Sequence, residues 1–475
     1  MSRELVERYV ATAARIGADA AALTLGQLAA IADSLHCSPG EIAVAEAMVR
    51  EGIAREEVIS RVLASFERNL KALDIGLAEG HSFLLGRIDR SMILSNALSC
   101  DDFLNRAIVY ALAAQVGNHT VGLEPCAGTG DSCTYTGLMR AMLDTIDDRE
   151  SIALAAAVML KIGVTFRVGK ITTGCNMEGL GAGAAATAGT LVQLHGGTGA
   201  QLQRAVVLAL SPTIANPCTP RVMVAGLCAT HLGGGILLGS LGAGLAMSTE
   251  IPIDVPVDVM VSMAGAAHVA SARAVVPEIV RYLQPFFKTN PKIDRLVGAD
   301  ALATEAESVR SVMAEAAGVA ERFARTSNPI TRPFGQAVVG GSSQAVGSPT
   351  NAARIAHALV EGEVRRVEIQ LYPELFARRG INVPGILMGA VWGAPTTDAK
   401  SYSSVVNEVE RLGIEVEIRC VDEPGAQCIT IFTDKGKSQV YALNRGGARL
   451  AIRSAIPSRQ LALEAARRLG IEVVD

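Results

Sequence analysis

The middle of the chain carries almost no charge, and this constrains the fold more than any other feature of the sequence. Between residues 179 and 249 the only charged side chains are Arg204 and Arg221, which leave uncharged runs at 179–203 and 222–249. Each run exceeds the roughly 20 residues that a helix needs to cross a bilayer. Such segments must be buried from water, either in a membrane or in the core of a large domain.

The composition of the two runs favours a protein core. They contain Gly, Ala, Thr and Ser as well as Leu and Ile, and they include His195 and His231. The Trp and Tyr belts and the Lys and Arg clusters that flank membrane spans are absent from the sequence around them. We therefore expect no membrane partner, and a buried helical centre in which small residues let the helices approach closely.

Charge and aromatic content argue against binding to nucleic acid. The 43 Lys and Arg residues are outnumbered by 47 Asp and Glu residues, and aromatic residues make up only 4% of the chain. No basic excess is left to neutralise phosphates, and few rings are available to stack on bases. The first residues begin a charged helix with no secretory signal, so we expect a cytoplasmic protein whose nine cysteines are reduced.

Hydrophobic periodicity divides the chain into a large helical part and a small mixed part. Residues 1–75 and 101–170 show the pattern of amphipathic helices, and 326–334 has the composition of a linker. The segments after it predict strands at Val367–Leu371, Glu415–Arg419, Cys428–Phe432 and Ser438–Tyr441, and helices at 349–361, 401–412 and 459–469. The predicted fold class is α+β, with a mainly helical domain at 1–325 followed by a small α+β domain at 326–475.

Three cysteines are candidate metal ligands. Cys175, Cys218 and Cys228 each lie in a turn rich in Gly or Pro. Thiolates are the ligands of iron–sulfur clusters, and turns allow several of them to converge on one cluster. Three cysteines without an obvious fourth suit a [4Fe–4S] cluster with one iron open to bind a substrate oxygen as a Lewis acid. Buried cysteines that only fill the core are the alternative interpretation.

Two loops offer donors for an anion at the start of a helix. Residues 124–133 and 340–351 both combine Gly with small hydroxyl side chains, although either loop could equally be a turn that caps a helix. Cys126 and Cys133 could also belong to a metal site. The candidate binding residues are Cys126, Gly128, Thr129 and Gly130 in the first loop, and Ser342, Ser343, Ser348 and Thr350 in the second.

The candidates for proton transfer are His119, which precedes the first loop, Asp131, which lies within it, and Glu178, three residues after Cys175. For His119, a hydrogen-bonded structural role is the alternative. The seven histidines form no spaced pair of the kind that binds catalytic zinc, and no nucleophile elbow is present.

Several of these segments resemble motifs of one enzyme family. Gly174-Cys175-Asn176-Met177-Glu178-Gly179 is similar to a Gly-Cys-Gln-(Gly/Ala)-Glu-Val-Gly segment, and Cys218–Cys228 is similar to a Cys-Asp-Pro-Val-Gly-Gly-Leu-Val-Gln-Val-Pro-Cys segment one residue longer. Glu124–Gly130 is similar in position to an Ala-Pro-Thr-x-Gly-Ala-Ala-Gly loop, and Asn444-Arg445-Gly446-Gly447 to a Gly-rich end. These are motifs of the iron–sulfur-dependent L-serine dehydratases (L-serine ammonia-lyases), which the chain resembles over almost its whole length.

The resemblance implies a [4Fe–4S] cofactor held by Cys175, Cys218 and Cys228, and an oxygen-sensitive lyase that eliminates water from a small β-hydroxy acid. The family reaction converts L-serine to pyruvate and ammonia. The family's Gly-Pro-Ser-Ser-Ser-His-Thr substrate loop is replaced here by 340–350, which has no His. This change suits the relative that dehydrates 2-(hydroxymethyl)glutarate to 2-methyleneglutarate. A cysteine desulfidase on the same scaffold and a non-catalytic ligand sensor are further alternatives, and the apolar centre suits a homodimer contact.

Overall fold

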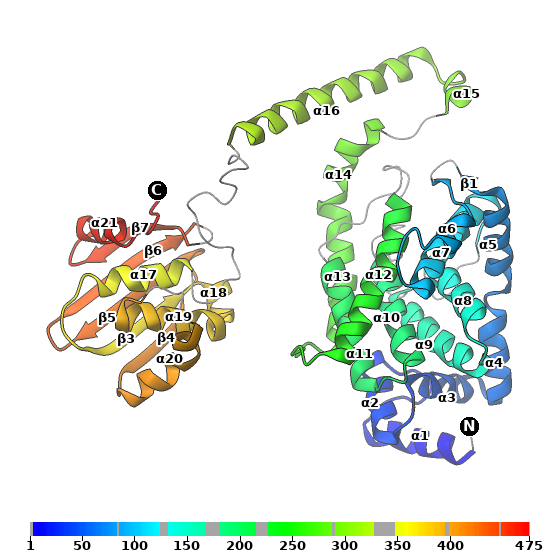
Figure 1. The fold of residues 1–475 in the computed structure, drawn as a ribbon, viewed down its shortest axis with the longest axis horizontal. Coiled ribbons are helices and arrows are strands. Elements are labelled where there is room, and N and C mark those ends of the chain that lie inside the picture. The colour runs from blue at the N-terminus through cyan, green and yellow to red at the C-terminus, as the bar shows by residue number, and fades with distance from the viewer. Residues whose placement is uncertain are drawn as a thin grey trace. The chain divides into compact units, whose positions relative to one another are not determined.

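The computed structural model divides the chain into two compact units, Met1–Gly318 and Val319–Asp475 (Figure 1). It describes residues 3–82, 85–123, 132–167, 180–214, 227–286, 290–326, 347–394, 399–445 and 448–474. The first unit is helical apart from one short hairpin, and the second contains a mixed sheet. A mainly helical part followed by a small α+β part agrees with the predicted fold class. The chain passes from one unit to the other within the helix that ends at Thr326, next to the predicted boundary at 325/326.

The helices of the first unit follow one another with short connections. The first six are α1 (Arg3–Arg15), α2 (Leu25–Leu35), α3 (Pro39–Glu51), α4 (Arg55–Ala64), α5 (Glu67–Glu79) and α6 (Ser91–Leu94), with the hairpin β1 (His81–Ser82) and β2 (Gly86–Arg87) between the last two. Next come α7 (Asp102–Thr120), α8 (Cys133–Thr145), α9 (Arg149–Arg167), α10 (Ala182–Leu194), α11 (Gly199–Leu210), η2 (Ser211–Thr213) and α12 (Leu227–Ser248). The last are α13 (Val257–Ala274), α14 (Val276–Leu283), η3 (Gln284–Phe286), α15 (Pro291–Asp294) and α16 (Ala299–Thr326).

The uncharged middle of the chain forms the centre of this unit. Its first run is broken at Gly196, which has a φ of +70°, so it folds as α10 followed by the start of α11. Residues 182–192 of α10 are all buried, and α10 packs against α9, α11 and α12. The second run forms α12, which also packs against α7. Figure 1 shows these helices gathered in one bundle.

Glycines bring the backbones of these helices into direct contact. A Cβ atom on Gly239 of α12 would overlap the side chain of Thr187 and lie 2.6 Å from the carbonyl oxygen of Ala184, both on α10. A Cβ atom on Gly137 of α8 would lie 2.5 Å from the carbonyl oxygen of Ala107 on α7. No larger residue fits at either crossing without moving the helices apart. The small residues of the sequence therefore set the spacing of the core.

One helix among the described residues has the length and apolar character of a membrane span. It is Ala229–Ser248 within α12, and 44% of its most apolar window is buried inside the unit. The helices Val257–Ser271 and Val276–Phe286 meet the same criteria of length and apolar character only if they are counted together as one span, which is bent by 52°. The core helix of a soluble protein passes the same test.

The second unit is a five-stranded mixed sheet with helices packed on it. The strands run in the order β4-β3-β5-β6-β7, with β3 and β4 parallel and all other neighbours antiparallel. The strands are β3 (Val364–Leu371), β4 (Glu415–Cys420), β5 (Ala426–Thr433), β6 (Lys437–Asn444) and β7 (Leu450–Ile456). The helices are α17 (Ser348–His357), α18 (Pro373–Ala377), α19 (Arg379–Trp392), α20 (Ala399–Arg411) and α21 (Arg459–Arg468).

The strands expected from alternation coincide with β3, β4, β5 and β6, and the three expected helices coincide with α17, α20 and α21. The alternate residues Val367, Ile369 and Leu371 of β3 are fully buried in the core of this unit. Three elements were not anticipated, namely β7, the short α18, and α19, which contains Pro384. The predicted linker at 326–334 lies almost entirely outside the described residues.

We expect Gly239→Ala and Gly244→Ala, on the same helix α12, to change stability in opposite directions. A Cβ atom at Gly244 would meet nothing within 4 Å, so this substitution should stabilise the protein by up to about 1 kcal/mol through helix propensity. At Gly239 the overlap with α10 should outweigh that gain and destabilise by about 1–3 kcal/mol. Urea unfolding of both variants measures this, and shifts of equal sign would contradict the packing.

Candidate functional site

The starts of α8 and α10 lie close together in the helical unit, beside the body of α12. A Cβ atom on Gly183, in the first turn of α10, would lie 3.2 Å from the hydroxyl oxygen of Thr134, in the first turn of α8. The Tyr135 hydroxyl of α8 also lies 3.5 Å from the carbonyl oxygen of Ala182. Leu180, two residues before α10, approaches within 3.5 Å of the Cβ position of Gly234 in the third turn of α12.

Most of the predicted site residues immediately precede these starts in the sequence. Cys126, Gly128, Thr129, Gly130 and Asp131 come just before α8, Cys175 and Glu178 just before α10, and Cys218 before α12, and all lie outside the described residues. Cys228 is the second residue of α12, and its side chain also lies outside them. The structure therefore brings together the described neighbours of the candidates before α8 and α10.

The start of α8 differs from the starts of α2 and α11. Its N-cap residue Ser132 forms no side-chain cap, whereas Thr24 and Thr198 form full capping boxes on α2 and α11. Leu180 and Gly181 form a π-helical turn that leads directly into α10, so α10 is not an open helix end. The positive end of the α8 dipole favours negative charge at its first turn.

A buried hydroxyl group at the same place has no hydrogen-bond partner. Thr134 is only 1% exposed, and its Oγ1 atom forms no hydrogen bond. By contrast, Thr136 and Thr187 nearby donate their hydroxyl hydrogens to the carbonyl oxygens of Ser132 and Gly183. Burying an unpaired hydroxyl costs about 1–3 kcal/mol, so Thr134 is a candidate for a bond to a bound ligand.

The structure places His119 in the last turn of α7, where the side chain is exposed. One ring nitrogen, Nε2, lies 2.7 Å from the Gln115 amide nitrogen, and the other, Nδ1, lies 2.9 Å from the Ser82 hydroxyl oxygen. The buried Cys133 thiol at the start of α8 donates to the Gln115 amide oxygen at 2.7 Å. Both ring nitrogens of His119 are thus engaged in hydrogen bonds.

Among the described side chains, no three His, Cys, Asp or Glu residues lie together as a metal site. The cysteines described as free thiols are Cys37, Cys100, Cys133, Cys420 and Cys428. Burial is the main cause that raises the pKa of Cys37 to about 11, and it also raises the pKa of Cys428. These two thiols therefore stay protonated at neutral pH, which does not suit a thiolate ligand.

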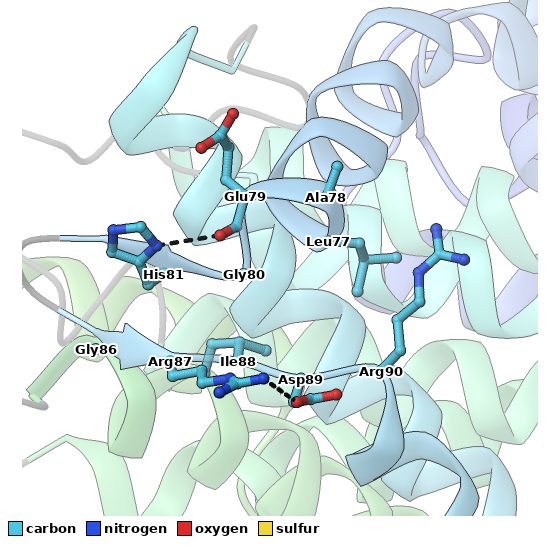
Figure 2. A pocket seen from close by; sticks show the side chains of 10 residues that line it. All are labelled: Leu77, Ala78, Glu79, Gly80, His81, Gly86, Arg87, Ile88, Asp89 and Arg90. Atoms are coloured by element: carbon cyan, nitrogen blue, oxygen red, sulfur yellow. Dashed lines mark hydrogen bonds and ion pairs between the residues drawn. The ribbon is translucent and has the colours of Figure 1, made fainter.

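A surface cavity of about 690 Å³ lies at the β1–β2 hairpin, beside Ser82 (Figure 2). Its charged lining is largely paired within itself, since Arg87 and Asp89 form an ion pair at 2.9 Å. The His81 Nδ1–H group donates to the carbonyl oxygen of Glu79, 3.1 Å away. The lining of this cavity contains none of the predicted site residues.

In the small unit, Ser348 and Thr350 lie in the first turn of α17 and are each 1% exposed. The Gln427 amide nitrogen of β5 donates to the Ser348 hydroxyl at 2.5 Å, while the Gln427 amide oxygen is buried without a partner. The Asn351 side chain donates to the carbonyl oxygen of Ala448 at 2.9 Å, which joins α17 to the end of the Asn444–Gly447 segment. Ser342 and Ser343 lie outside the described residues.

Sequence reasoning missed the polar residues that the fold adds to these places. These residues are Thr134, Gln115 and Gln427, which lie inside helices or strands. A Thr or Gln in such an element does not by itself indicate a functional site. Thr134 follows directly on the 124–133 loop, and this adjacency was the one available signal.

Comparison of the sequence with models of protein families finds no match, and a search of curated proteins also finds none. The site is therefore interpreted from its own geometry and from the motifs in the sequence.

We expect Ser348→Ala to destabilise the small unit by about 1–3 kcal/mol, because it leaves both ends of the buried Gln427 amide without a partner. Adding Gln427→Leu should recover most of this loss, since the double variant buries no unpaired amide. Thermal unfolding of the two single variants and the double variant forms a mutant cycle. Additive effects would show that the two side chains do not interact.

Proposed function

We propose that this protein is an iron–sulfur-dependent hydro-lyase that eliminates water from a small β-hydroxy acid, as the L-serine dehydratases do. The observation that supports the proposal is the meeting of the starts of α8 and α10 at the unpaired hydroxyl of Thr134, beside the third turn of α12. Each of these starts directly follows a segment that resembles a motif of that family. These motifs are far apart in the sequence and form one site in the family. In this fold, residues next to them in sequence lie close together.

The residues around this place fit a cluster held by Cys175, Cys218 and Cys228. Cys175 lies five positions before Leu180, so the chain keeps it within about 18 Å of the start of α10. Cys228 is part of the first turn of α12. A cluster with thiolate ligands is anionic, and uncapped helix starts stabilise negative charge. When bound, it would supply an open iron that acts as a Lewis acid toward a hydroxyl leaving group.

The protein itself would bind and orient the substrate acid. The positive end of the α8 dipole would attract a carboxylate, and the Thr134 hydroxyl would donate to it. These donors stabilise the negative charge that develops when the proton next to the carboxylate is removed. The tight packing of α8 against α10 keeps water from the inner side of the site.

Asp131 and Glu178 are the residues we assign to proton removal. Asp131 lies two positions before α8 and Glu178 two positions before Leu180, next to the converging helix starts. A carboxylate there would take the proton from the carbon next to the substrate carboxylate as the β-hydroxyl leaves. His119 is less suited to this step, because Gln115 and Ser82 already engage both of its ring nitrogens.

L-Serine is the substrate to test first. Loss of water from L-serine forms an enamine, which takes up water again on hydrolysis to pyruvate and ammonia. We expect protein purified without oxygen, and loaded with iron and sulfide, to release pyruvate from L-serine. If the protein instead forms 2-methyleneglutarate from 2-(hydroxymethyl)glutarate, this dicarboxylate is the substrate. Sulfide release from L-cysteine would indicate a desulfidase.

Iron content tests the cysteine assignment separately from the substrate. Cys218→Ser should lose both bound iron and turnover, because one of three thiolate ligands is removed. Cys420→Ser is the matched control, since Cys420 is an exposed thiol in the small unit, and it should keep both. Full iron content in the Cys218 variant would overturn the assignment.

Thr134→Val should lower turnover at least about tenfold with no loss of stability, because the hydroxyl it removes makes no bond within the protein. Thr187→Val is the control: it removes a hydroxyl that bonds to Gly183 at 2.7 Å, so it should cost about 1 kcal/mol of stability instead. Kinetics and urea unfolding on both variants separate the two effects. Unchanged turnover in the Thr134 variant would exclude it from substrate binding.

A further inference from the structure

A second cavity of the helical unit, of about 420 Å³, is bordered by the starts of α7 and α9, the ends of α8 and α10, and the middle of α12. Its volume is within the range of sites that bind small molecules. On α8 it is lined by Ile146, at the end opposite to Thr134. The rise of the helix separates these two residues by about 18 Å, so the cavity is distinct from the candidate site.

Apolar side chains from α7, α10 and the end of α8 line this cavity. They are Phe103, Leu104, Ile146, Leu191 and Leu194. Leu191 is 6% exposed and the other four are half-buried, so a ligand in the cavity would cover apolar surface that now meets water. This part of the lining suits a ligand with a hydrocarbon body.

The polar side chains of the described lining can all accept a hydrogen bond. They are Asp101, Ser151, His195 and Ser240. One carboxylate oxygen of Asp101 accepts the N–H of Leu104 at 2.8 Å, and the carboxylate has lone pairs for further donors. The Ser151 hydroxyl donates its hydrogen to Asp148 at 2.5 Å, so its oxygen can only accept from a ligand. A ligand that carries several donors matches this set.

The charges around the cavity favour a cation. Asp101 caps the start of α7, and Asp148 accepts the N–H groups of Glu150 and Ser151 at the start of α9, so both positive helix ends are matched by a carboxylate. The negative ends of α8 and α10 also lie here, and neither helix has a basic residue in its last turn. The described lining contains no Lys or Arg, and the neutral imidazole of His195 offers an acceptor nitrogen.

We propose that this cavity binds a small organic amine, with the ammonium group on Asp101 and the hydrocarbon part against the leucines of α7 and α10. An ammonium group has three hydrogens to donate and no lone pair, which matches a lining of acceptors. Its bond to a carboxylate is stronger than a bond between neutral groups. The inference goes beyond the proposed function and does not rest on it, because the cavity lies at the other ends of α8 and α10.

Calorimetric titration of the full-length protein with 2-phenylethylamine, 2-phenylethanol and 3-phenylpropionate tests the proposal, because the three compounds share a body and differ in charge. The amine should bind at least about tenfold more tightly than the alcohol, and the carboxylate should bind most weakly. Asp101→Asn should remove most of the preference for the amine and keep the helix cap, since Asn caps as well as Asp does. Glu305→Gln is the matched control: it removes an exposed carboxylate of α16 that does not line the cavity, and it should keep the preference.

Equal affinity for the amine and the alcohol would overturn the proposal, and so would tighter binding of the carboxylate or no binding of any of the three. A preference that survives in Asp101→Asn would exclude this carboxylate as the partner of the ammonium group. Ser240→Leu places a larger side chain in the cavity from α12, and unchanged affinity for the amine in that variant would show that it binds elsewhere. Urea unfolding of each variant checks that it is folded. The titration needs neither iron nor turnover, so this proposal and the proposed function can fail separately.

Discussion

Direct contact between helix backbones is the constraint on which the helical unit depends. Gly76 of α5 and Gly117 of α7 illustrate it, because a Cβ atom on either one would overlap the backbone of the other helix. Gly137 and Gly239 play the same part where α8 meets α7 and where α12 meets α10. Packing at this density leaves no room for a side chain, so the glycine positions fix both the spacing and the register of the helices.

This register brings the starts of α8 and α10 together, beside the third turn of α12. If any of these helices slid by one turn, about 5.4 Å, Thr134 would no longer meet Gly183, or Leu180 would leave Gly234. An apolar bundle therefore holds the unpaired hydroxyl of Thr134 at one end of α8. The stability of the core and the electrostatics of the candidate site are two results of the same packing.

Among the described residues, two buried polar atoms without a partner lie at the places of interest, the Thr134 hydroxyl oxygen and the Gln427 amide oxygen. In the helical unit, the Cys133–Gln115–His119–Ser82 chain lies beside the unpaired Thr134 hydroxyl. In the small unit, Gln427 pairs with Ser348 through its nitrogen alone. Buried amides and hydroxyls form hydrogen bonds only in the directions of their donor and acceptor atoms. An unpaired one therefore determines whether a neighbouring group must be a donor or an acceptor, and where it must lie.

The sequence by itself determined the two-part organisation, because the helical and strand periods are local properties of the chain. The alternation of Val367, Ile369 and Leu371 predicts β3 correctly, and the uncharged middle predicts the buried helix α10, whereas α12 keeps an exposed face that includes Leu237 and Leu241. It did not reveal β7, or α19 with its internal Pro384, since neither has a clean period. Nor did it place Gln115 between Cys133 and His119, or His119 beside Ser82, 37 positions away. Only the tertiary structure decided these pairs, because a hydrogen bond depends on distance in space, and the packing of helices sets that distance.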